Sequence, residues 1–130
     1  MKEWIGILFV AVIMPAQADW EAIEKTDSGT TRYVDWNTLR SSGRDSIRRI
    51  WLLVDMQRPN NVGTLSYRSV EEMDCKKEKI RILQATYFTG PMATGEVTSE
   101  RSVPSEARYV VPGSVGETIL MEVCKRRPTR

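Results

Sequence analysis

The sequence contains no histidine, and this absence removes several classes of active site at once. Catalytic triads of the Ser-His-Asp type and Cys-His pairs need an imidazole base, and histidine-ligated zinc needs an imidazole ligand. Among the 130 residues there is also no P-loop, no G-x-G-x-x-G, no S-x-x-K and no EF-hand spacing. We therefore expect a protein that is not an enzyme and that uses no cofactor and no metal.

Long hydrophobic runs are also missing. The longest runs from Trp4 to Met14 and is well short of the roughly 20 apolar residues that cross a bilayer, so we expect no transmembrane anchor. Lys2 precedes this run and the A-x-A sequence of residues 16–18 follows it, which predicts a signal peptide over residues 1–18. A buried N-terminal helix is the alternative, and Pro15 fits it less well. Because no cysteine follows the run, we expect an exported product, periplasmic or extracellular, that is not lipid-anchored.

The sequence has no large excess of charge of either sign, because its 19 Lys and Arg residues are nearly balanced by 17 Asp and Glu residues and the net charge is +2. Such a balance does not favour nucleic acid as a partner. Residues 19–130 are enough for a single domain. Its one sharp charge run is a basic tail, residues 125–130, which we read either as a solvated disordered tail or as a contact to lipid head groups, lipopolysaccharide or sulfated polysaccharide. The candidate binding residues are Lys125, Arg126, Arg127 and Arg130.

Only two cysteines are present, Cys75 and Cys124. In an exported chain they most simply form one disulfide, which would close a long loop and add substantially to the stability of a small domain. The alternative is a reactive thiol, but no C-x-x-C sequence is present to lower a thiol pKa.

Period-2 hydrophobic patterning predicts that most of the chain is strand. The segment Ile47–Val54 is apolar on both faces and is expected to be a central strand. Asp35–Arg44 is expected to be a single capped turn followed by a loop, and Thr89–Ala107 a mobile surface loop with a short strand near Val97. The other expected strands are Trp20–Lys25, Thr31–Val34, Leu65–Cys75, Lys79–Phe88 with a bulge near Ile82, and Tyr109–Val111.

A helix is expected only at the C-terminal end. Ser114 and Glu117 form an S-x-x-E capping box, and Val115, Ile119 and Val123 then fall on one helical face. The predicted fold is therefore α+β, mainly β: an antiparallel sheet of about five to six strands with a C-terminal helix packed on it and tethered by one disulfide.

Four acidic residues, Glu71, Glu72, Asp74 and Glu78, lie close together in the sequence. Two paired carboxylates could serve acid and base catalysis, but neighbouring lysines make a solvated strand face the better interpretation.

Several segments in order resemble the surface-adhesin protein E-like family of proteobacterial envelope proteins. They are "YVDWNTLRSSG" (33–43), "RIWLLVDM" (49–56), "YRSVEEMDC" (67–75), "RILQATYFTGPMATGEV" (81–97) and "YVVPGSVGETILMEVC" (109–124). The resemblance spans nearly all of residues 19–130. It implies a small antiparallel sheet with a C-terminal helix tethered by a disulfide between Cys75 and Cys124.

The resemblance also implies a kind of function. Family members characterised as adhesins bind host proteins such as vitronectin, laminin and plasminogen, and can form dimers. We therefore expect an exported, non-enzymatic binding module whose partners are host or envelope proteins or anionic surface polymers. The alternative is a periplasmic structural or assembly protein that self-associates, for example as a homodimer, through a sheet edge.

Overall fold

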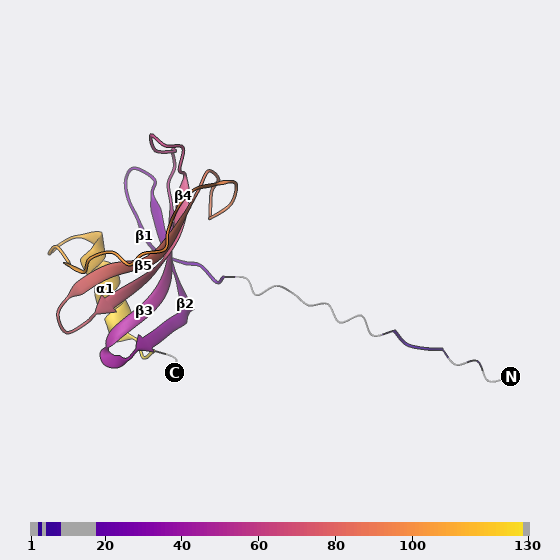
Figure 1. The fold of residues 1–130 in the computed structure, drawn as a ribbon, viewed down its shortest axis with the longest axis horizontal. Helices are drawn as coiled ribbons and strands as arrows, with labels where there is room; N and C mark the ends of the chain where they lie inside the picture. Colours follow the sequence, from indigo (N-terminus) through magenta and orange to yellow (C-terminus); the bar gives the residue numbers. More distant parts are fainter. Residues whose placement is uncertain (1–2, 4, 9–17, 129–130) are drawn as a thin grey trace.

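The computed structural model describes residues 3, 5–8 and 18–128, apart from the side chain of Asp45. Within them the chain forms seven strands and then one helix (Figure 1). The elements are β1 (Glu21–Lys25), β2 (Thr31–Ser42), β3 (Arg44–Asp55), β4 (Ser66–Asp74), β5 (Lys79–Phe88), β6 (Val97–Arg101), β7 (Arg108–Tyr109) and α1 (Val115–Lys125). Most of the expected signal peptide lies outside the described residues, so its cleavage stays a prediction.

All strand pairs are antiparallel, and the spatial order β1-β2-β3-β4-β5-β6 follows the chain. The short strand β7 pairs with the first residues of β5, whereas β6 pairs with its last residues. Two short strands therefore share one edge of the sheet. Helix α1 lies against one face of this twisted sheet (Figure 1), which confirms the predicted mainly-β architecture.

The main hydrophobic core lies between the sheet and α1. Ile119, Leu120 and Val123 of the helix are buried against the sheet residues Val34, Leu39, Ile50, Leu52 and Met73. Period-2 patterning explains the sheet side of this core, because every second residue of β3 and β4 points toward the helix. The predicted helical face of Ile119 and Val123 is thereby confirmed.

The prediction of a turn and loop over Asp35–Arg44 was wrong, because β2 continues to Ser42. The pairing of β2 with β3 jumps from Asp35↔Trp51 to Arg40↔Arg49, so a large bulge interrupts the strand. Buried Asp35 organises it: its Oδ1 accepts from Asn37 N at 3.1 Å, and its carbonyl oxygen accepts from Thr38 Oγ1 at 2.6 Å. These local hydrogen bonds produce the turn signal in the sequence, although the strand resumes beyond it.

Other local predictions are confirmed. Between β4 and β5 the register shifts so that Leu83 is the extra residue, next to the predicted position of a bulge. Ser114 is the N-cap of α1 and its Oγ accepts from Glu117 N at 3.3 Å. The Glu117 carboxylate accepts from Gly113 N at 3.2 Å rather than from Ser114 N, one residue earlier than in a standard capping box.

The expected loop Thr89–Ala107 contains β6, and its first part is tied down by hydrogen bonds. Ser66 Oγ donates to Gly90 O at 2.6 Å and accepts from Ala93 N at 2.8 Å. Asp55 Oδ1 accepts from Met92 N at 2.9 Å. The loop is thus held against the ends of β3 and β4.

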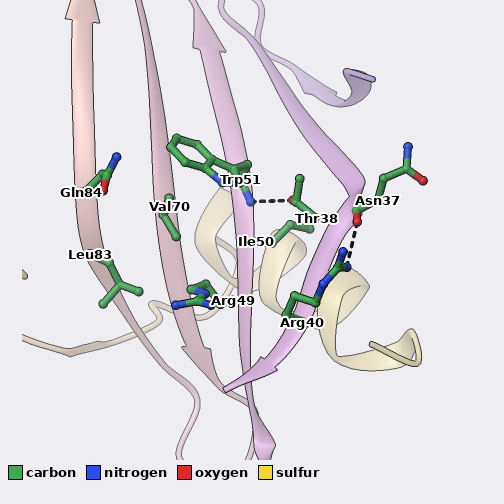
Figure 2. A pocket seen from close by; sticks show the side chains of 9 residues that line it. All are labelled: Asn37, Thr38, Arg40, Arg49, Ile50, Trp51, Val70, Leu83 and Gln84. Carbon is green, nitrogen blue, oxygen red and sulfur yellow. Dashed lines mark hydrogen bonds between the residues drawn. The ribbon is translucent and has the colours of Figure 1, made fainter. Parts of the chain in front are cut away.

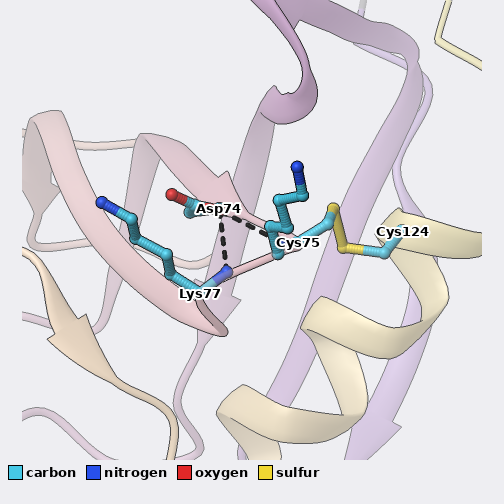
Figure 3. Close-up of a disulfide and its surroundings, with 5 residues drawn as sticks. Asp74, Cys75, Lys77 and Cys124 are labelled. Carbon is cyan, nitrogen blue, oxygen red and sulfur yellow. Dashed lines mark hydrogen bonds between the residues drawn. A yellow bond between two sulfur atoms is a disulfide. The ribbon is translucent and has the colours of Figure 1, made fainter.

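The two cysteines form a disulfide between the end of β4 and the last turn of α1 (Figure 3), as predicted. Their Cα atoms are 5.8 Å apart and 49 positions apart in the sequence. The bond closes a loop that contains β5, β6, β7 and nearly all of α1.

Removal of this bridge is expected to destabilise the domain. A Cys75→Ser/Cys124→Ser variant should lose about 4 kcal/mol of unfolding free energy, because a loop of this length is no longer restrained in the unfolded chain. Urea denaturation monitored by circular dichroism measures the loss, and reduced wild-type protein serves as the matched control. Equal midpoints for the variant and the oxidised wild type would contradict the prediction.

Candidate functional site

Three segments far apart in the sequence meet at the disulfide-bonded end of the molecule: the β2–β3 hairpin, the β4–β5 turn and the end of α1. Cys75 N donates to Ser46 O at 2.8 Å, which joins the turn to the hairpin, and the disulfide joins the turn to the helix. Each segment carries exposed cations. We call this surface the basic end; its residues are Arg44, Arg49, Lys76, Lys77, Lys125, Arg126 and Arg127.

The β4–β5 turn presents its lysines to solvent. Asp74 Oδ1 accepts from the backbone amides of Lys76 at 3.1 Å and Lys77 at 2.9 Å (Figure 3). The Asp74 carboxylate thus shapes the turn, and both lysine side chains are exposed. A hollow of about 520 Å³ lies beside them, between the turn and the start of β3, lined also by Arg44 and Ile47.

The structure places the predicted tail residues beside these cations, but in different settings. Lys125 Nζ pairs with Glu122 Oε1 at 3.1 Å, and the Arg126 guanidinium lies 3.8 Å from the centroid of the Trp36 ring. Arg127 is exposed, and Arg130 lies outside the described residues. Arg126 thus contacts the bulge of β2 through the Trp36 ring, although the residue itself is exposed.

A trough of about 440 Å³ crosses the face of the sheet opposite α1 (Figure 2). Arg49 and Trp51 of β3 project into it, and Arg40 of β2 lines one side. Arg40 Nη1 donates to the carbonyl oxygens of Asn37 at 2.8 Å and Leu39 at 2.9 Å, so the bulge of β2 holds this guanidinium in place. Because Arg49 belongs to both, the trough continues the basic end across the sheet.

Sequence patterns did not identify Arg40, Arg49 and Trp51 as site residues. Their contribution depends on the β2–β3 register, which pairs Arg40 with Arg49 and Asp35 with Trp51. A strand prediction extended through Ser42 would have brought these residues together.

The acidic residues lie in different settings. Glu71 faces the helix, whereas Glu72 faces the opposite side and pairs with Arg81 Nε at 2.9 Å. Asp74 shapes the turn. Within residues 3, 5–8 and 18–128, no group of three or more potential ligands is arranged to hold a metal ion.

The pKa of the Glu71 carboxyl departs strongly from its usual range. Burial raises its pKa to about 7, and this effect exceeds the opposing influences of the Ser69 hydrogen bond and of the Arg32 charge. Burial, followed by the Glu71 charge, also raises the pKa of Tyr67, which lies four residues away on the same face of β4. The region under the helix is thus poorly solvated.

The combination of an antiparallel sheet, one C-terminal helix joined to it by a disulfide and a surface of exposed cations defines a small disulfide-tethered domain. In the described part of the chain no helix is long and apolar enough to cross a membrane. The chain belongs to the surface-adhesin protein E family, whose model matches residues 20–125. Membership of this family of adhesin-like surface proteins implies an exported product.

Solved structures share the fold. Crystal form II of Haemophilus influenzae protein E matches with a TM-score of 0.66 at 10% identity, covering 89% of this chain and 94% of that one. Its Se-Met form matches with a TM-score of 0.65 at 13% identity, covering 85% and 91%. At such low identity these matches show the fold alone. A search of curated proteins finds no match.

Glu71 should make stability depend on pH. Its folded-state pKa of about 7 lies above the ordinary value of 4.5, so the folded protein holds a proton that the unfolded chain releases. Unfolding free energy should therefore fall by up to about 3 kcal/mol as pH rises from 4.5 to 7. A Glu71→Gln variant should lose this part of the slope, as measured by urea denaturation across pH.

The matched control for this experiment is Glu72→Gln, because Glu72 is the next residue and faces the other side. Tyr67, Tyr87 and Arg32 remain unchanged in both variants. The same pH slope in Glu71→Gln and wild type would show that Glu71 titrates normally.

Proposed function

We propose that this protein is an exported, non-enzymatic binding module whose ligand is a polyanionic surface, such as a sulfated polysaccharide or the phosphorylated part of lipopolysaccharide. Family membership supports an adhesin-like surface protein. The observation that carries the choice of ligand is the gathering of cations from three segments at one end of a chain whose net charge is only +2.

The chemistry of this surface fits an anionic polymer better than a compact anion. Arg44, Lys76 and Lys77 are exposed around an open hollow, so they offer several separate charges rather than one enclosed site. The trough extends this surface and adds Arg49 and the Trp51 ring. Guanidinium groups can form paired hydrogen bonds with sulfate or phosphate, and the Trp51 ring adds apolar area for a sugar face.

Neutralising two cations of the basic end should weaken binding strongly. An Arg49→Gln/Lys77→Gln variant should bind heparin, used as the probe, about thirtyfold more weakly at low salt, because each cation near an anionic surface contributes about 1 kcal/mol. Isothermal titration calorimetry measures this change. Raising the salt concentration should weaken wild-type binding more steeply than variant binding.

The control is Lys25→Gln/Arg58→Gln, which changes the net charge equally at the opposite end of the sheet. Register places Lys25 opposite Thr31 and Thr31 opposite Asp55, three residues before Arg58 and far from the β2–β3 hairpin. Equal losses of heparin affinity in the two double variants would show an effect of net charge alone. If the wild-type protein does not bind heparin, the proposed ligand is refuted.

The tail requires a separate variant, because Arg126 also packs on Trp36. Lys125→Gln/Arg127→Gln removes two tail charges and keeps that contact. A loss similar to that of Arg49→Gln/Lys77→Gln would assign the tail to the same surface, whereas unchanged affinity would confine binding to the hairpin, the turn and the trough.

Self-association through a sheet edge is the second candidate function. The observation in its favour is β6, an edge strand whose residues are mostly exposed, including Val97 at 52%. Glu100 and Arg101 of the same strand carry charges, and charged edge strands discourage pairing between sheets. Light scattering over a range of concentrations tests this candidate, and a constant monomer mass would reject it.

A further inference from the structure

Glu71 interrupts the apolar face that β4 turns toward α1. In the sheet register Glu71 lies between Ile50 of β3 and Ile82 of β5, so its neighbours on both sides are aliphatic. An ionisable group at such a place costs stability unless a partner compensates it. Packing of the core therefore does not explain why a carboxyl group occupies this position.

A crevice of about 190 Å³ opens beside this carboxyl, between the sheet and the first turns of α1. Leu52, Val54 and Ile82 of the sheet and Val115 and Ile119 of the helix form its apolar walls. Gly116 also lines the crevice on the helix side. The crevice is thus an apolar slot with a carboxyl group on its sheet side.

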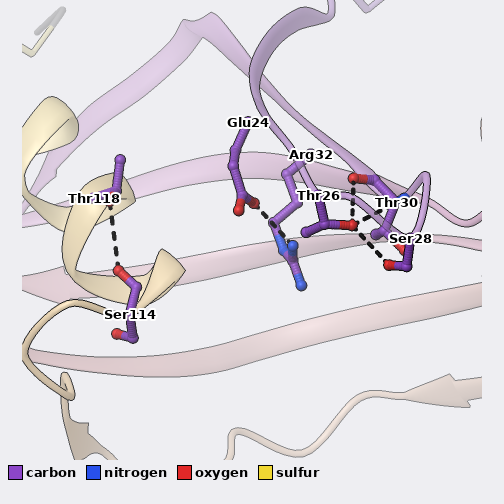
Figure 4. Close-up of polar contacts among 7 residues, drawn as sticks. All are labelled: Glu24, Thr26, Ser28, Thr30, Arg32, Ser114 and Thr118. Carbon is purple, nitrogen blue, oxygen red and sulfur yellow. Dashed lines mark hydrogen bonds and ion pairs between the residues drawn. The ribbon is translucent and has the colours of Figure 1, made fainter.

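Polar groups in the crevice leave Glu71 weakly compensated. Among the described residues, the hydrogen bond that reaches its carboxylate comes from Ser69 Oγ, at a long 3.4 Å. The Arg32 charge acts on Glu71, but the Nη1 of Arg32 pairs with Glu24 Oε2 at 2.9 Å (Figure 4). Tyr67 lies on the same face, with its ring centroid 5.1 Å from that of Tyr87.

We propose that this crevice binds a small organic cation, a primary ammonium on a short aliphatic chain, whose charged group pairs with the Glu71 carboxylate. The ammonium group would be the charged partner that Glu71 lacks in the sheet. The aliphatic chain of the ligand would fill the slot between Ile82, Val115 and Ile119. The same geometry favours a cation over an anion, since Glu24 pairs with Arg32 Nη1 and the ionised Glu71 carboxylate repels negative charge.

The size of the crevice limits the ligand. About 190 Å³ corresponds to the liquid volume of roughly six water molecules, so a ligand of about five to eight non-hydrogen atoms fits. A ligand this small binds weakly, with a dissociation constant of about 1 mM expected for a simple alkylamine.

Binding should also depend on pH. The ammonium pairs with the ionised carboxylate, and burial holds the pKa of Glu71 at about 7, so affinity should rise as pH increases through 7. The groups that face Glu71 are Arg32 from β2 and Tyr67 and Ser69 from β4, with Tyr87 of β5 next to Tyr67; β3 and α1 present apolar side chains to it.

The test uses n-butylammonium chloride as the probe and two-dimensional ¹H–¹⁵N NMR of the whole mature chain at pH 8. We expect saturable shifts of the amide signals of Ser69, Val115 and Gly116, and at least a tenfold weaker dissociation constant in Glu71→Gln. Glu72→Gln is the matched control and should bind like wild type, because Glu72 lies on the other face and pairs with Arg81. Sodium chloride at equal ionic strength provides the salt blank.

Three results would overturn the proposal: no saturable shift in wild type, equal binding by Glu71→Gln, or equal shifts with sodium butyrate. The last would indicate an anion site at Arg32 instead. Loss of binding in Glu71→Gln counts only if its spectrum shows an intact fold, which the neutral and nearly isosteric amide should allow. The outcome is independent of heparin binding, because none of the cations altered there lines this crevice.

Discussion

The covalent bond between Cys75 and Cys124 is the constraint on which the rest of this structure depends. The bond joins the end of β4 to the last turn of α1. It therefore holds the helix against the sheet and closes the main core. A domain of this size buries a limited apolar area, and a cross-link over a long loop supplements what the core provides. The same bond also determines which charged segments become neighbours.

Much of the fold could be predicted from the sequence because its signals are local. Period-2 patterning identified β3, β4 and β5, and the Ser114 cap identified the start of α1. β2 was predicted too short, because the Asp35 and Thr38 side chains form the local hydrogen bonds to backbone that are typical of a turn, whereas the strand continues beyond them.

The candidate site was less predictable. The sequence marked the basic tail, since Lys125, Arg126 and Arg127 are contiguous, but it did not mark Arg49 or Lys77, which are isolated from one another along the chain. Their proximity follows from strand register and from the disulfide, both of which are long-range properties. The sequence alone shows Glu71 as a charged residue on an alternating, otherwise uncharged face of β4, but the crevice beside it also requires the position of α1.

The uneven placement of cations has a mechanical consequence. A molecule whose positive charge gathers at one pole experiences a torque in the field of a negatively charged layer, and it turns before it makes contact. It would then contact that layer with its disulfide-bonded end. The turns after β1, β3 and β5 lie at the opposite pole (Figure 1), so they would form the outward-facing tip of a coated surface, available to whatever meets it next.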